Sequence, residues 1–84
     1  MLNIQYFSSL RETLGRSAEV LALPEGVGTV GALADHLASS RGGAWPALQD
    51  VTQVLVAVNQ TIVDRGYPLT GTEEVAFFPP MTGG

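Results

Sequence analysis

The chain has 84 residues, no cysteine and a net charge of −4, from eight acidic side chains against four arginines. This length predicts one domain, because a second unit would have no core of its own. The absence of cysteine excludes disulfides, thiolate zinc sites and a cysteine nucleophile. The acidic balance argues against nucleic acid, which attracts clustered Lys and Arg, and is compatible with docking on a basic protein surface.

The chain shows no signal for export or for membrane insertion. No apolar run approaches the roughly 20 residues that a membrane-spanning helix needs. Residues 1–7 also lack the basic segment and the cleavage site of a signal peptide. We therefore expect a cytoplasmic protein.

The first part of the chain predicts a strand, a short helix and a second strand. Apolar and polar side chains alternate over residues 2–7, which is typical of a half-buried strand. Residues 8–15 predict a short helix, in which Ser9 and Glu12 have capping-box spacing. Residues 18–23 predict the second strand, antiparallel to the first.

The remaining elements are a long helix and three strands. Residues 30–41 carry an apolar stripe at helical spacing, and Thr29 before them is a suitable N-cap. Residues 54–58 are apolar on both faces, which is typical of a central strand. Short strands are expected over residues 61–64 and 74–78.

This order of elements predicts an α+β domain in which the helices cover one side of a mixed sheet. Residues 44–50 show no periodicity, so we expect irregular chain there, anchored to the core by Trp45 or Leu48. The domain is expected to span residues 1–78. Residues 79–84 are expected to form an extended, mobile tail.

Three segments carry a resemblance to a known family. Residues 6–12, 54–60 and 75–84 have the sequences YFSSLRE, VLVAVNQ and VAFFPPMTGG. They resemble the small subunits of molybdopterin synthase, also called molybdopterin-converting factor subunit 1, and the likeness covers essentially the whole chain. Its most specific element is the F-F-P-P-x-x-G-G ending. The resemblance implies a β-grasp, ubiquitin-like fold: a mixed sheet of about five strands packed on one main helix plus a short helix, with the first and last strands parallel at the centre.

The turn before the last strand departs from the family pattern. The family commonly has Asp-Gly-Asp there, whereas this chain has Gly71, Thr72 and Glu73. The glycine that supplies a positive φ has therefore moved by one position, which leaves the exact turn type open.

The end of the chain has the properties of a segment that enters another protein. Pro79 and Pro80 lack the N–H that a strand ladder needs, so the strand ends there and the chain leaves extended. Gly83 and Gly84 have no side chains, so a narrow channel can admit them. The Gly84 carboxylate is therefore the expected reacting group.

The resemblance implies that other proteins supply the chemistry at Gly84. An E1-like adenylating enzyme would use ATP to form an acyl-adenylate, and a persulfide sulfur donor would displace AMP to leave a thiocarboxylate. The large subunit of molybdopterin synthase would then use this sulfur to build a dithiolene on a cyclic pyranopterin, with two small subunits on a dimer of large ones. The chain itself is expected to be a sulfur-donating, non-catalytic subunit that binds no cofactor and no metal.

Exposed aromatic residues suggest where such partners dock. By alternation, Phe7 and Phe78 lie on the faces opposite the buried residues of their strands, and Ile62 is expected nearby. Apolar patches of this kind usually mark partner sites. The alternative is that they pack under a loop or helix. The expected partner-binding residues are Phe7, Arg11, Ile62, Phe78, Pro79, Pro80, Met81 and Thr82.

No other residues predict a competing catalytic site. His36 is the only histidine and is expected on the solvent side of the long helix, whereas a metal site needs several donors. Glu73 and Glu74 are interpreted as a solubilising edge beside a turn.

Three alternative functions remain open at the level of sequence. A ubiquitin-like modifier would be conjugated to protein lysines through Gly84, using the same activated diglycine. A thiamine-pathway sulfur carrier also ends in Gly-Gly, but it lacks the Phe-Phe-Pro-Pro run and the opening pattern. A plain β-grasp binding module would carry an inert tail.

Overall fold

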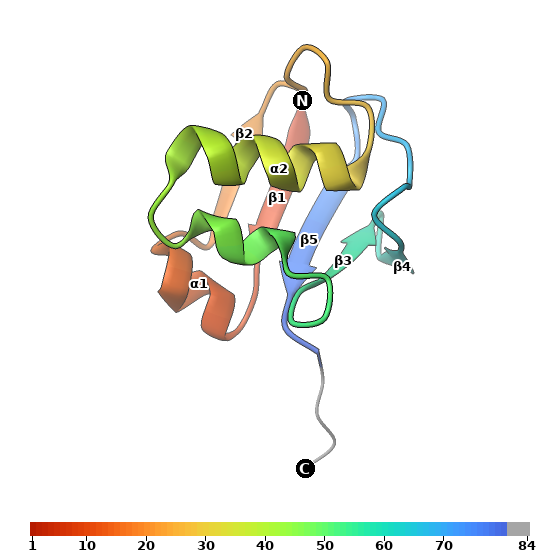
Figure 1. The fold of residues 1–84 in the computed structure, drawn as a ribbon. Helices are drawn as coiled ribbons and strands as arrows, with labels where there is room; N and C mark the ends of the chain where they lie inside the picture. The colour runs from red at the N-terminus through yellow and green to blue at the C-terminus, as the bar shows by residue number, and fades with distance from the viewer. Residues whose placement is uncertain (81–84) are drawn as a thin grey trace.

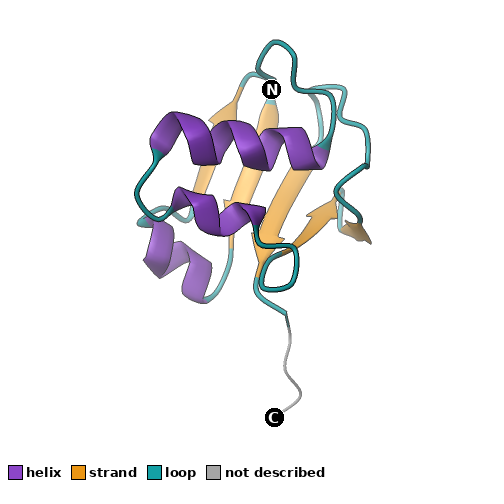
Figure 2. Ribbon diagram, in the orientation of Figure 1, coloured by secondary structure: helices purple, strands orange, loops and turns teal. Residues whose placement is uncertain are grey.

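The computed structural model describes residues 1–80, and it confirms an α+β domain built on one five-stranded sheet (Figures 1 and 2). The elements, in chain order, are β1 (Leu2–Tyr6), α1 (Ser9–Leu14), β2 (Ala18–Leu21), α2 (Val30–Arg41), the 3₁₀ helix η1 (Trp45–Gln49), β3 (Leu55–Val58), β4 (Thr61–Val63) and β5 (Glu74–Phe78). The strands lie in the order β2-β1-β5-β3-β4. The expected strands therefore all form, with ends that differ from the prediction by one or two residues.

The first and last strands pair in parallel at the centre of the sheet, as the β-grasp arrangement requires. Tyr6 of β1 lies beside Phe77 of β5, and β2 and β3 flank this pair in antiparallel orientation. Figure 2 shows α2 and η1 in front of the sheet, with α1 at its lower edge. Within residues 1–80 the opposite face carries no helix, and we call it the open face.

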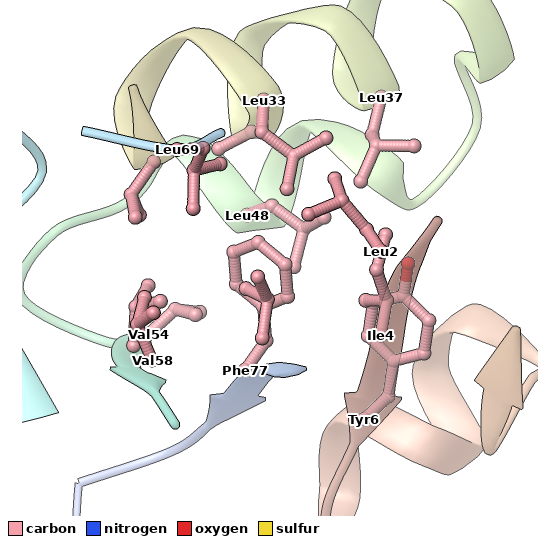
Figure 3. Close-up of a cluster of buried hydrophobic side chains, with 14 of the residues drawn as sticks. Leu2, Ile4, Tyr6, Leu33, Leu37, Leu48, Val54, Val58, Leu69 and Phe77 are labelled. Carbon is pink, nitrogen blue, oxygen red and sulfur yellow. The ribbon is translucent and has the colours of Figure 1, made fainter. Parts of the chain in front are cut away.

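The core lies between the sheet and α2 because the strands alternate in the way the sequence predicts. Leu2, Ile4 and Tyr6 are buried, and they share this side of the sheet with Phe77. Figure 3 shows Leu33 and other side chains of α2 pointing toward them. The fully buried side chains are Tyr6, Phe77, Leu2, Ile4, Leu33, Leu37, Leu48, Val30, Val56 and Val75. None of the helices in the described part of the chain is long and apolar enough to cross a membrane.

Two local predictions were wrong. The N-cap of α1 is Ser8, which makes no side-chain capping hydrogen bond and has φ 55° and ψ −134°, so the expected capping box of Ser9 and Glu12 does not form. Residues 44–50 are also not irregular, because most of them form η1, a 3₁₀ helix that has proline in its first turn. Such short helices have no apolar periodicity long enough to be recognised in a sequence.

The other local predictions at the helices are confirmed. The hydroxyl oxygen of Thr29 accepts a hydrogen bond from the amide of Ala32 at 3.1 Å, as an N-cap should. Leu48 is fully buried, and Trp45 is partly buried with its ring edge-on to Tyr6 at a centroid distance of 5.3 Å. Both residues therefore anchor η1 to the core.

A polar cluster centred on Glu19 joins the edge strand β2 to the end of α2. The Arg41 guanidinium donates two hydrogen bonds of 2.6 Å to the two oxygens of the Glu19 carboxylate, and the Tyr6 hydroxyl donates a third of 2.8 Å. The guanidinium also lies 4.4 Å from the centre of the Trp45 ring. Arg41 lowers the pKa of Glu19, while burial and the hydrogen bond to Glu19 raise the pKa of Tyr6, so the phenol stays a neutral donor.

We predict that Glu19→Ala lowers the free energy of unfolding by about 2 kcal/mol, since it leaves Arg41 and the Tyr6 hydroxyl without their acceptor. Urea unfolding followed by circular dichroism measures this change. Glu25→Ala, which removes an exposed carboxylate, is the matched control and should change stability by less than about 0.5 kcal/mol. Equal effects of the two substitutions would contradict this account.

Candidate functional site

The root of the tail, Pro79 and Pro80, directly follows the central strand β5. β5 ends at Phe78, directly before Pro79 and Pro80, as the two prolines predict. Because β5 runs parallel to β1, this end lies at the edge of the sheet opposite the N-terminus (Figure 1). Both prolines are half-buried. Met81, Thr82, Gly83 and Gly84, on which the predicted chemistry depends, lie outside the described residues.

Phe77 fixes the position from which the tail begins. Its side chain is fully buried and stacks on Tyr6 at a centroid distance of 5.8 Å. Its carbonyl oxygen accepts a hydrogen bond of 3.0 Å from the amide of Phe7, beyond the end of β1. The chain therefore leaves the sheet from a backbone that is paired on both sides, by β1 and by β3.

Beside this root, one half of the open face is apolar. We call it the open-face patch and define it by six residues: Phe7, Leu55, Ala57, Ile62, Ala76 and Phe78. Phe78 pairs with Leu55, while Ala57 pairs with both Ala76 and Ile62, so these side chains form two adjacent rows on one face. The alternation of β1 brings Phe7 to the same face.

The patch contains two of the most exposed large apolar side chains of the described chain. Ile62 is 65% exposed and Phe7 is 43% exposed, whereas Phe78 is half-buried. The other half of the open face is mostly polar, because Asn3 of β1 lies beside Glu74 of β5 and Gln5 lies on the same face, although Val20 of β2, beside Asn3, is exposed there too. The patch is therefore a bounded apolar surface with a polar border, which is the usual composition of a partner site.

The structure brings together most, but not all, of the predicted docking residues. Phe7, Ile62 and Phe78 fall on one face, as expected, and no helix of residues 1–80 covers them. Arg11 is exposed on α1, which follows Phe7 directly, but α1 lies at the lower edge of the sheet and Arg11 is not part of the patch.

Three residues of the patch were missed by the sequence analysis, namely Leu55, Ala57 and Ala76. The signal was present, since residues 54–58 are apolar on both faces. This pattern is typical of a strand at the centre of a sheet, covered on both faces. In the described structure β3 does lie between two strands, but helices cover only one of its faces. The second apolar face therefore belongs to the patch.

Glu73 is not part of a solubilising edge, as the sequence suggested, because it is buried and closes the loop before β5. Its carboxylate accepts four hydrogen bonds of 2.8–3.1 Å, from the amide and hydroxyl of Thr70 and from the amides of Gly71 and Thr72. Burial alone would raise the pKa of Glu73, but these hydrogen bonds outweigh it and lower the pKa to about 2. Glu73 is thus ionised at neutral pH, and its carboxylate holds the loop together through these hydrogen bonds.

In the turn before β5, the residue with a positive φ is Gly71. Its φ is 112°, a conformation that favours glycine, and a Cβ there would lie 3.4 Å from the Cβ of Leu23. The loop therefore keeps its positive φ one position from the family's usual place, and the ionised Glu73 fixes it.

The described residues offer no other reactive centre. His36 is half-buried instead of lying on the solvent side. Within residues 1–80, no three His, Asp or Glu side chains lie close enough to hold a metal ion.

The topology, with parallel β1 and β5 at the centre, α2 across one face and the tail leaving from the end of β5, defines a β-grasp domain of the ubiquitin-like class. The model of the ThiS family matches residues 4–84, so the chain belongs to the ThiS family.

Comparisons with individual proteins agree with this assignment. The chain is 40% identical to the molybdopterin synthase sulfur carrier subunit of Escherichia coli and 36% identical to that of Haemophilus influenzae, in each case over the full length of both chains. Among solved structures, the small archaeal modifier protein 1 of Haloferax volcanii is similar with a TM-score of 0.71 and 26% identity, covering 95% of this chain and 97% of that one. A putative molybdopterin converting factor, subunit 1, from Pyrococcus furiosus has a TM-score of 0.72 at 24% identity, covering 95% and 97%, and supports the fold alone.

We predict an acid-sensitive contribution of Glu73 to stability. Because the pKa of Glu73 in the folded protein, about 2, is below its usual 4.5, the carboxylate stabilises the fold fully above pH 4.5, and this contribution is lost as the pH falls toward 2. Glu73→Gln should therefore destabilise the protein at pH 7, and its difference from the wild type should shrink at pH 3. Urea unfolding at the two pH values measures this, and a pH-independent difference would contradict the role of the charge.

Proposed function

We propose that this chain is the sulfur carrier subunit of a molybdopterin synthase, and that it carries sulfur as a thiocarboxylate at Gly84. Two relatives with this name match it over their whole length. The observation that carries the proposal is the open-face patch, because an apolar surface beside the paired end of β5 supports the docking of a partner next to the start of the C-terminal segment.

The reaction follows from the chemistry of a carboxylate, which is a poor electrophile. An E1-like enzyme transfers AMP from ATP to a Gly84 oxygen and releases pyrophosphate. The terminal sulfur of a persulfide attacks the carbonyl carbon and AMP leaves. A thiol then cleaves the S–S bond, so that the sulfur stays on Gly84 as a thiocarboxylate. In the large synthase subunit this sulfur is transferred to the pyranopterin, and the carboxylate is restored.

The residues of this chain present the reacting atom and do not catalyse. Glu73 is kept ionised by its four hydrogen bonds, and Glu19 is occupied by Arg41 and Tyr6, so neither is available as an acid or base. We expect the acid–base groups to come from the partner. The contribution of this chain is a fixed tail root and an apolar surface that orients the partner around it.

A second candidate function is supported by the structural similarity to the small archaeal modifier protein 1. In that case Gly84 would be joined to the amino groups of other proteins. Intact mass analysis of the protein purified from its native host separates the two functions. A sulfur carrier shows replacement of one oxygen by sulfur, whereas a modifier shows isopeptide-linked adducts.

We predict that deleting Gly84, or adding one residue after it, abolishes sulfur transfer and leaves the melting temperature unchanged. The reason is that both changes misplace the reacting carboxylate without touching the core. Sulfur transfer is measured as dithiolene formation with the large subunit, and the melting temperature by circular dichroism. A parallel fall in stability would show that the end of the chain has a structural role instead.

We also predict that Phe78→Asp weakens binding to the large subunit by more than about 1 kcal/mol, because it places a charge in the centre of the patch. Val20→Asp is the matched control, since Val20 is exposed on the polar half of the same face. Titration calorimetry measures both affinities. If Phe78→Asp binds as well as Val20→Asp, the patch is not the docking surface.

A further inference from the structure

A groove lies on the other side of the tail root, on the face of the sheet that the helices cover. It is formed between α1, the residues that follow η1 and the start of β3, with a volume of about 230 Å³. Leu10 and Val54 form its apolar base, and both are buried. Thr13, Asp50 and Gln53 supply its polar border. With about 30 Å³ for each water molecule, the groove has room for roughly seven waters, or one large side chain.

The groove is continuous with the root of the tail because Pro79 lines it. On the opposite face of the sheet, the open-face patch also reaches the root of the tail, because its residue Phe78 directly precedes Pro79. A protein that surrounds the tail after Pro80 therefore has to contact both surfaces. The patch is apolar, so the groove is the part of the rim where a polar contact can select the partner.

Among residues 1–80, Asp50 is the only charged residue that lines the groove. Its Oδ1 accepts hydrogen bonds from the amide and the hydroxyl of Thr52, at 3.0 and 2.7 Å, and these lower the pKa of Asp50, so it is ionised at neutral pH. Within residues 1–80 it takes part in no ion pair, since both ion pairs there belong to Glu19. The groove thus presents an apolar base with a carboxylate at its border that makes no close ion pair within residues 1–80, although the positive charge of Arg65 acts on it from a longer distance.

We propose that this groove receives a basic side chain, arginine or lysine, from the protein that binds the tail. The aliphatic part of such a side chain would lie on Leu10 and Val54, and its charged end would reach the Asp50 carboxylate. The net charge of −4 favours a basic partner surface in the same sense. The inference deepens the proposed function and rests on it, because it assumes that the tail enters a partner.

Two substitutions test separately whether binding needs the charge of Asp50 and whether it needs the empty space of the groove. Asp50→Asn removes the charge but keeps an oxygen that can accept from Thr52, and Glu25→Gln removes an equal charge from an exposed loop. Thr13→Met fills the groove with an uncharged side chain, and Ser40→Met adds the same side chain to an exposed position of α2. Urea unfolding shows that each variant is folded.

Affinity for the large synthase subunit is measured by titration calorimetry at low and at high ionic strength. Asp50→Asn should weaken binding about tenfold, the usual effect of losing a hydrogen bond to a charged group. Thr13→Met should weaken binding by about the same factor, because its side chain occupies the space that the partner side chain would fill. Glu25→Gln and Ser40→Met should stay within about twofold of the wild type. The loss in Asp50→Asn should shrink at high ionic strength, because salt screens the charge.

The result that overturns the groove proposal is wild-type affinity for both Asp50→Asn and Thr13→Met. In that case the proposed function still stands, provided that the wild type binds the large subunit and transfers sulfur and that Phe78→Asp weakens binding. If the wild-type chain neither binds the large subunit nor transfers sulfur, both proposals are overturned.

Discussion

The parallel pairing of β1 with β5 is the interaction on which the rest of the structure depends. It joins the two ends of the described chain at the centre of the sheet, with Tyr6 stacked on Phe77 in the core. Because β5 is hydrogen-bonded to β1 on one edge and to β3 on the other, the position of Pro79, the next residue, is defined. The same pairing brings Phe7 next to the end of β5, so the open-face patch and the start of the tail are positioned by one set of backbone hydrogen bonds.

Much of the fold could be predicted because its signals are local. Alternation in residues 2–7, the helical stripe of residues 30–41 and the two prolines after Phe78 each act within a few residues. The errors arise where the outcome depends on distant contacts. The position of Glu73 beside a turn predicts an exposed, solubilising side chain, whereas its carboxylate accepts hydrogen bonds from the loop of residues 70–72. The resemblance, and not periodicity, supplied the parallel pairing of β1 and β5.

The candidate site was predictable only in part, for a related reason. Phe7 and Phe78 stand out as aromatics on otherwise polar or mixed faces, so the sequence reveals them. Leu55 and Ala57 do not stand out, because an apolar strand looks the same whether its second face meets a helix or a partner protein. The groove beside Pro79 was not predictable at all, since it is formed by residues of α1, of η1 and of the segment between η1 and β3 that only the folded chain brings together.

The ion pair between Glu19 and Arg41 is relevant to the sulfur-donating partner that this chain would have under the proposed function. Small domains often depend on disulfides to hold an edge strand to a helix, and here an ion pair does so instead. A persulfide exchanges sulfur with any thiol or disulfide that it can reach. Under the proposed function, a fold that is closed by an ion pair and contains no cysteine would offer no such sulfur atom, so a persulfide donor could pass its sulfur only to the activated end of the chain.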